Sequence, residues 1–189
     1  MRIGIVGCAG RMGQILVQEV LKTKGCELAG GTEGSDNVAL GADVATYSGL
    51  PECAMVISED TETLFGASDV VIDFTLPALT AHHLELARTY NTSVILGTTG
   101  HNENEFELIE KAAKNVAIVK AMNFSIGVNA LFALTEQLST LLDDHFDVEI
   151  FEMHHRHKVD APSGTAIALG EAAAKGRSVV LSDVSVSGR

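Results

Sequence analysis

The sequence predicts a doubly wound α/β domain built on a parallel sheet, followed by a second, smaller domain. Three observations support this prediction. Short apolar runs alternate with helical segments over the first two thirds of the chain, and these runs are almost continuous in Val and Ile, as in strands that are buried on both faces. A glycine-rich turn joins the first run to the first helical segment. This alternation is typical of βα units that build a parallel sheet.

The individual elements follow from the hydrophobic periodicity. The strands are expected at residues 2–7, 26–31, 54–58, 69–74, 93–97 and 116–120. The helices between them are expected at residues 11–25, 78–90 and 103–114. The glycine-rich segment 32–53 is expected to be irregular.

The pattern changes near residue 123, which divides the chain into a first domain of residues 1–123 and a second of residues 124–189. An amphipathic helix is expected at 127–145, with an apolar stripe made of Val128, Leu131, Phe132, Thr135, Leu138 and Leu142. An alternating strand at 146–153, a helix at 163–176 and the start of a strand at 178 follow. The second domain is therefore expected to be a small, incomplete α+β substrate domain.

Composition excludes several classes of protein. The chain has 189 residues, 46% of them hydrophobic, and a net charge of −12, so it lacks the basic footprint that non-specific nucleic-acid binding needs. No apolar run approaches the roughly 20 residues of a membrane span. The three cysteines, Cys8, Cys26 and Cys53, are scattered and fit a reducing cytoplasm better than a disulfide framework.

A glycine motif follows the first strand. Gly7, Gly10 and Gly13 are spaced by three residues and open a helix, where backbone amides can approach a phosphate group. Glu33 stands at the end of the next strand, where a carboxylate can bind ribose hydroxyls. The alternative is a tight strand–helix turn without a ligand.

Three later loops contain mainly small or polar residues: DFTLP (73–77), GTTG (97–100) and AMNFS (121–125). Each follows an expected strand, and ligands of open α/β sheets bind beyond the carboxyl ends of the strands. Ordinary turn chemistry explains any one of these loops equally well. Together they favour a binding crevice.

The stretch HHRHKVDAPSGTA (154–166) is a dense basic cluster in an acidic chain. It is either a solvated loop, a metal site, or a site for anion binding and proton transfer. A metal site would use His155 and His157, but Arg156 and Lys158 would repel the cation, so no metal is expected.

The third interpretation fits the residue types best. Histidine changes its protonation near neutral pH and lysine supplies a cationic donor. Ser163, Gly164 and Thr165 open a helix whose first amides can bind an anion. The cluster therefore predicts a dicarboxylate site with a proton donor.

The motifs VGCAGRMG, VIDFT, GTTG, NFSIGVN and HHRHKVDAPSGTA resemble the 4-hydroxy-tetrahydrodipicolinate reductase (dihydrodipicolinate reductase) family of lysine and diaminopimelate synthesis. The resemblance covers the whole chain. It implies a Rossmann-like fold and an NAD(P)H-dependent reduction of 4-hydroxy-tetrahydrodipicolinate to tetrahydrodipicolinate, a small cyclic dicarboxylate. It also implies a homotetramer formed through the C-terminal domains. Because the family continues well past residue 189, the chain is expected to be a fragment.

The resemblance also implies roles for individual residues. His154 and Lys158 match the catalytic proton donors, and His155, Gly164 and Thr165 match substrate-binding positions. The matched cofactor contacts are Gly7, Cys8, Ala9, Gly10, Arg11, Met12, Glu33, Gly97, Thr98, Thr99, Ala121, Met122, Asn123 and Phe124.

The cofactor is expected to be NADH in preference to NADPH, with NADPH still possible. Gly34 stands where many relatives carry an arginine, and segment 30–43 contains no Lys or Arg, so little except Arg11 would offset the repulsion between Glu33 and a 2′-phosphate. Two other classes remain open at this point. One is a nucleotide-binding sensor without turnover, and the other is a metal-dependent hydrolase.

Overall fold

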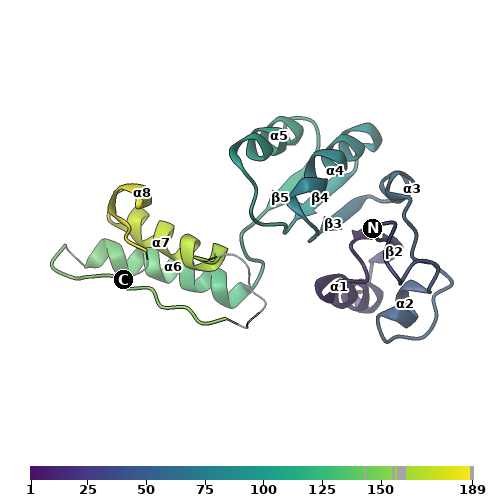
Figure 1. Ribbon diagram of the computed structural model, residues 1–189, viewed down its shortest axis with the longest axis horizontal. Helices are drawn as coiled ribbons and strands as arrows, with labels where there is room; N and C mark the ends of the chain where they lie inside the picture. The colour runs from purple at the N-terminus through teal and green to yellow at the C-terminus, as the bar shows by residue number, and fades with distance from the viewer. Residues whose placement is uncertain (143, 155, 157–160, 188–189) are drawn as a thin grey trace. The chain divides into compact units, whose positions relative to one another are not determined.

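The computed structural model describes residues 1–142, 144–154, 156 and 161–187. By its contacts the chain divides into two compact units, Met1–Lys120 and Ala121–Arg189 (Figure 1). The division falls three residues before the boundary expected at 123, and each unit is described by itself.

The first unit is a parallel sheet of five strands. The strands are β1 (Arg2–Val6), β2 (Glu27–Thr32), β3 (Val70–Asp73), β4 (Ser93–Leu96) and β5 (Ile118–Lys120), in the spatial order β2-β1-β3-β4-β5. The chain therefore moves one way from β1 to β2 and the other way through β3, β4 and β5. Since crossovers between parallel strands are right-handed, the connecting helices must cover opposite faces.

The helices follow this rule. Contacts join α1 (Arg11–Lys22) and α2 (Val44–Tyr47) to the core on one face, and α3 (Thr61–Ala67), α4 (Pro77–Tyr90) and α5 (Glu103–Ala113) to the core on the other. Figure 1 shows the helices arranged around the sheet. The expected doubly wound α/β fold is confirmed.

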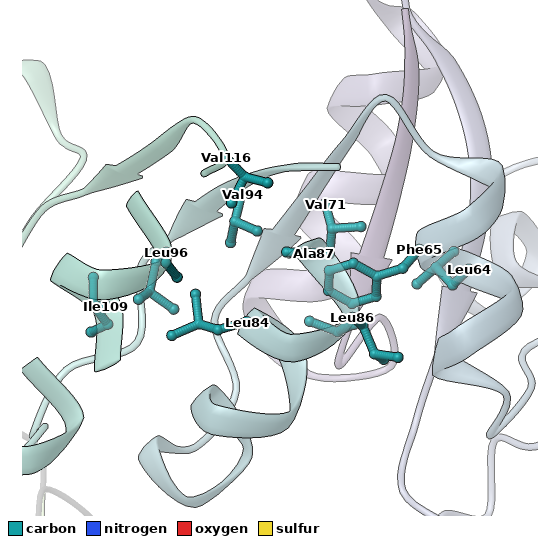
Figure 2. Packing of buried hydrophobic residues seen from close by; sticks show 12 residues of the cluster. Leu64, Phe65, Val71, Leu84, Leu86, Ala87, Val94, Leu96, Ile109 and Val116 are labelled. Carbon is teal, nitrogen blue, oxygen red and sulfur yellow. The ribbon is translucent and has the colours of Figure 1, made fainter. Parts of the chain in front are cut away.

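Two cores result from the alternation of side chains along each strand. Ile5 of β1 joins the core beneath α1, while Val6 joins the core beneath α4. In the latter core, Val71 and Val94 from the strands lie near Ala87 of α4 and Phe65 of α3 (Figure 2). The sheet therefore holds its loop ends rigidly, which positions any site built on them.

Local signals fix the helix ends. Asn102 caps α5 by accepting from the Glu105 amide at 3.0 Å, and the Glu105 carboxylate accepts from the Asn102 amide at 2.8 Å. α4 begins at Pro77 and ends at Tyr90, and it is capped by Asn91, whose φ of 53° is left-handed.

The prediction of a strand at residues 54–58 is wrong. The segment makes only isolated bridges, Thr32 to Ser58 and Asp43 to Val56, and Val56 is 62% exposed. Its Ile57 amide bonds to the Ala42 carbonyl of a loop at 2.8 Å, and only Ser58 reaches the end of β2, so the segment does not form a sixth strand. The short helices α2 and α3 were not expected, because a single turn or two carries little periodicity.

The second unit is helical in its described residues, with α6 (Ile126–Leu141), α7 (Gly164–Gly176) and α8 (Leu181–Val184). The strand expected at 146–153 is absent from this part of the structure, and the segment expected to start a strand at 178 instead leads into α8. A strand needs a hydrogen-bonded neighbour, and no other described segment of this unit pairs with residues 146–153. The described residues of this unit therefore contain helices and no strand.

Helices α6 and α7 cross closely. A Cβ added at Gly176 would lie 2.4 Å from the Glu136 carbonyl oxygen and 2.8 Å from Ser139 Cβ, so glycine is needed there. Lys175 binds Glu136 at 2.9 Å. The expected stripe is only partly covered, because Leu131 and Leu138 of α6 are exposed.

Candidate functional site

The glycine loop between β1 and α1 is packed too tightly for side chains. A Cβ at Gly13 would lie 2.1 Å from the Gly7 carbonyl oxygen, and one at Gly7 would lie 2.8 Å from Thr75 Cγ2. Gly7 also has a left-handed φ of 70°. No side chain caps α1 at Gly10, so the first amides of this helix remain available to an anion.

Glu33 lies at this loop, directly after β2. Its Oε1 accepts a hydrogen bond of 2.7 Å from the Ala9 amide. The neighbouring Cys8 is buried, and burial followed by the charge of Glu33 raises the pKa of its thiol to about 12. Any ligand contact of Cys8 would therefore come from its backbone.

The loops after β3 and β4 meet at a buried acid that the sequence analysis did not single out. Asp73 ends β3, is 0% exposed and accepts from His83 Nδ1 at 2.7 Å and from Thr98 Oγ1 at 3.1 Å. Because Thr98 is itself buried, its side chain faces this acid, whereas Thr99 is exposed. A lone Asp at the end of the apolar run VVID was the signal, since a buried carboxylate needs donors.

A second polar cluster lies beyond β4 and β5 in the first unit. His101 Nε2 lies 2.8 Å from Thr80 Oγ1, and Lys120 Nζ lies 4.9 Å from the centre of the Phe106 ring. Burial, followed by the charge of Lys120, lowers the pKa of His101, and burial lowers the pKa of Lys120. Partial burial at this edge of the sheet therefore disfavours the charged forms of both His101 and Lys120.

In the second unit, the segment before α6 contacts the start of α7. Asn123 Nδ2 donates to Thr165 Oγ1 at 3.4 Å, and the Met122 side chain lies 3.3 Å from the position of a Cβ at Gly164. Ala121 and Met122 are half-buried and Phe124 is exposed at 41%. Residues that the family resemblance matched to cofactor and to substrate are thus neighbours here.

His154 is anchored to the same helix start through Glu152, which the sequence analysis missed. Glu152 Oε2 lies 2.8 Å from His154 Nε2, and Glu152 Oε1 accepts from the Ser163 amide at 2.9 Å. The hydrogen bonds from Ser163, followed by the one from His154, lower the pKa of Glu152 to about 2. Ser163 in turn caps α7 by accepting from the Ala166 amide at 3.0 Å.

His155 and Lys158 lie outside the described residues, as does His157 of the alternative metal pair. Among the residues that the structure does describe, no group of three His, Cys, Asp or Glu side chains could hold a metal ion. Within the same part of the chain, no helix is long and apolar enough to cross a membrane.

A doubly wound sheet with an uncapped glycine loop at the start of α1 and an acid after β2 defines the class of this protein: its first unit is a nucleotide-binding domain, as found in NAD(P)H-dependent oxidoreductases. Family models identify the member of that class. The model described as dihydrodipicolinate reductase, N-terminus, matches residues 1–124, and the model for the C-terminus of the same enzyme matches residues 127–186. The chain belongs to the dihydrodipicolinate reductase family.

Individual relatives agree. The 4-hydroxy-tetrahydrodipicolinate reductases of Parvibaculum lavamentivorans and Rhizobium meliloti are 47% and 41% identical over the whole of this chain, which covers 70% and 78% of their lengths. A dipicolinate-bound dihydrodipicolinate reductase from Paenisporosarcina sp. TG-14 superposes with a TM-score of 0.70 at 29% identity, over 94% of this chain and 66% of that one.

The expected family and enzyme class, a reductase of diaminopimelate and lysine synthesis, are therefore confirmed. The relatives compared are named as enzymes, and nothing among them favours a nucleotide sensor. The chain spans only about two thirds of the solved structure's length.

Proposed function

We propose that this chain carries the reduction of 4-hydroxy-tetrahydrodipicolinate to tetrahydrodipicolinate, with residues 1–123 binding the dinucleotide and residues 124–189 contributing to the substrate site. The observation that supports this most directly is the 3.4 Å hydrogen bond between Asn123 and Thr165. It joins the segment matched to the cofactor with the helix start matched to the substrate.

The residues of the first unit fit a dinucleotide. Gly7 and Gly13 leave no room for a Cβ, so backbone amides can approach a pyrophosphate, and α1 presents its uncapped first turn. The contacts proposed from this unit are the glycine loop Gly7 to Met12, Glu33, and Gly97 to Thr99. The residues Ala121 to Phe124 of the second unit are proposed as further cofactor contacts. The reduced dinucleotide, when bound, supplies the hydride.

The substrate side of the site is proposed from the second unit. The amides at Gly164 and Thr165 open α7 and would bind a carboxylate of the cyclic substrate, assisted by His155. His154 donates the proton that the reduction consumes, and Lys158 assists it. Glu152 holds His154 Nε2 at 2.8 Å and so orients the imidazole.

NADH is the proposed preferred cofactor. Glu33 lies against the glycine loop, and a Cβ added at Gly34 would have nothing within 4 Å, so no neighbouring side chain fills the space beside it. The carboxylate of Glu33 repels a 2′-phosphate, while exposed Arg11 is the cation of this loop that would offset the repulsion. NADPH would be used less efficiently.

The full protein is proposed to be a cytoplasmic homotetramer. Ile126 and Leu141 of α6 are 88% and 82% exposed, and Phe151 is 91% exposed. Apolar surface of this kind is typical of subunit interfaces. The described cysteines are free, which suits a reducing compartment.

The decisive experiment is an assay of dinucleotide oxidation with freshly generated 4-hydroxy-tetrahydrodipicolinate, in the protein as its gene encodes it. We expect substrate-dependent loss of NADH absorbance, with kcat/KM higher for NADH than for NADPH at fixed ionic strength. Binding of NADH without oxidation would instead indicate a sensor, and activity that a chelator abolishes would indicate a metal enzyme.

A further inference from the structure

The carboxylate of Asp73 is buried, and both of its oxygen atoms accept hydrogen bonds. It accepts four hydrogen bonds: from the Thr75 amide at 2.8 Å, Thr75 Oγ1 at 2.7 Å, Thr98 Oγ1 at 3.1 Å and His83 Nδ1 at 2.7 Å. The donors come from the loop after β3, the loop after β4 and the middle of α4. One side chain thus ties together three separate parts of the nucleotide-binding domain.

The loops that Asp73 joins are also interlocked by packing. A Cβ at Gly97 would lie 2.2 Å from the Phe74 ring, and the Gly97 amide bonds to the Asp73 carbonyl at 2.8 Å. Thr75 Cγ2 fills the space above Gly7. A displacement of Asp73 would therefore move the backbone on both sides of it.

Stability alone does not explain an ionisable pair at this position. Burial by itself raises the pKa of Asp73, but the hydrogen bond and charge of His83, followed by the bonds from Thr75, outweigh burial and lower that pKa overall. Apolar side chains can often replace a buried ion pair without loss of stability, whereas a fully bonded carboxylate fixes the direction of every donor. The arrangement suits a function that depends on loop geometry.

Glu33 and the start of α1 follow β2 and β1 and are proposed for the adenosine half, so the loops after β3 and β4, on the other side of β1 in the sheet, are left for the nicotinamide half. We infer that Asp73 and His83 are positioning residues that hold the loops Phe74–Leu76 and Gly97–Gly100 in the geometry needed for that half. The inference rests on the proposed function. Neither residue touches the cofactor, since both are buried, and they act through the backbone of the loops that do.

The adenosine half gives an internal reference. Its proposed contacts are the start of α1 and Glu33, which are held by the Ala9 amide and by packing of Gly13, not by hydrogen bonds to Asp73. Loss of the Asp73 network should therefore disturb NADH much more than ADP-ribose, which lacks the nicotinamide. A general loss of structure would disturb both ligands alike.

The first test compares His83→Leu with His83→Asn in the protein as its gene encodes it. The leucine removes the donor to Asp73, whereas the asparagine amide replaces Nδ1. We expect His83→Leu to lower kcat about 10²-fold, as small misplacements of reacting groups do, with the Kd of ADP-ribose changed less than about twofold. His83→Asn should recover most of the loss, and His82→Leu, a change at the exposed neighbour on α4, serves as the matched control.

A second pair of variants covers the case in which His83→Leu does not fold. Thr75→Val keeps the shape of the side chain, including the Cγ2 atom that packs against Gly7, but removes the hydroxyl that donates to Asp73, and Thr75→Ser restores that hydroxyl. The valine variant should lower kcat while the Kd of ADP-ribose stays nearly unchanged. The serine variant should recover most of the lost kcat.

The outcomes separate this inference from the function on which it rests. If the unaltered protein neither binds NADH nor oxidises it with substrate, the proposed function fails and the inference fails with it. If the unaltered protein is active, the positioning role is overturned when the valine and leucine variants keep full kcat, or when they lose NADH and ADP-ribose affinity in equal proportion.

Discussion

His154 is held by the Glu152 carboxylate, which is itself fixed to the start of α7. This makes the imidazole an oriented donor rather than a freely rotating surface side chain. We expect His154→Ala to lower kcat by about 10²–10⁴, the usual contribution of a general acid, with the Kd of NADH nearly unchanged. Steady-state kinetics and a binding titration would measure both quantities.

The matched control for that change is His145→Ala, since the His145 side chain is 86% exposed and lies outside the proposed site. Near-normal turnover in the His154→Ala protein would show that the proton comes from another group. Lys158→Ala is expected to lower turnover in the same way.

Gly34 offers a direct test of cofactor preference. It is exposed and a Cβ there would meet nothing within 4 Å, so an arginine fits without strain. Gly34→Arg should raise the ratio of kcat/KM for NADPH over NADH by about three- to fivefold, the size of an exposed ion pair of up to about 1 kcal/mol. Gly34→Gln, which adds a long neutral side chain, should leave the ratio unchanged, and added salt should weaken the arginine effect.

Helix α1 packs so closely against the glycine loop that its Gly13 leaves no room for a side chain. A methyl group at Gly13 would collide with backbone atoms of Gly7 and Cys8 at 2.1 Å and 2.6 Å. We expect Gly13→Ala to lower the free energy of unfolding by about 1–3 kcal/mol and to weaken dinucleotide binding, because α1 must move away from the loop. Denaturant unfolding would show this, and Gly34→Ala, which has open space, should show neither effect.

The hydrogen bond between Glu152 and the Ser163 amide at the start of α7 should weaken at low pH. The pKa of Glu152 is lowered from 4.5 to about 2, so its stabilising bond to the Ser163 amide is fully present above about pH 4.5 and is lost as the pH falls toward 2. Hydrogen exchange of the Ser163 amide, corrected for its intrinsic pH dependence, should lose protection over that range. In the Glu152→Gln protein this amide should show no such transition, and an unchanged transition there would assign the effect to another group.

The sequence predicted the elements that are long or that consist mostly of apolar residues in a regular pattern. The five sheet strands and the helices from α1 to α7 with at least three turns were found, because burial on two faces or one leaves a clear pattern. Segments 54–58 and 146–153 have the same apolar pattern, but the first forms only isolated bridges and the second pairs with no described segment, which composition does not reveal.

The site was predictable for similar reasons and to a similar extent. Gly7, Gly13 and Glu33 form a motif with fixed spacing, and the structure brings them together. Asp73 with His83, and Glu152 with Ser163, join residues that lie ten and eleven positions apart, on different elements or segments. The apolar run before Asp73 marks that acid, but the donors that each acid meets depend on tertiary contacts, which no local pattern shows.

At the scale of the whole molecule, the two units differ in how well they bury their own apolar residues. Both large cores consist entirely of residues from the first unit. We expect residues 1–120 to fold alone, with cooperative thermal unfolding and measurable binding of ADP-ribose. Residues 121–189 alone, which expose Ile126, Leu141 and Phe151, should associate or remain partly unfolded, as size-exclusion chromatography and circular dichroism would show.

The 189-residue chain should therefore bind NADH weakly and turn over little substrate, although its first unit is folded. A soluble, fully active tetramer formed by these 189 residues would contradict this expectation.

The place of β1 between β2 and β3 has a consequence for synthesis on the ribosome. Ile3 pairs with Leu28 on one side and with Val70 on the other, so one edge of β1 stays open while the residues up to β3 are being made. At roughly 5–20 residues per second, this leaves a nascent edge exposed for seconds. The glycine loop, which is closed on one side by Thr75, therefore acquires its final shape only after β3 has left the exit tunnel.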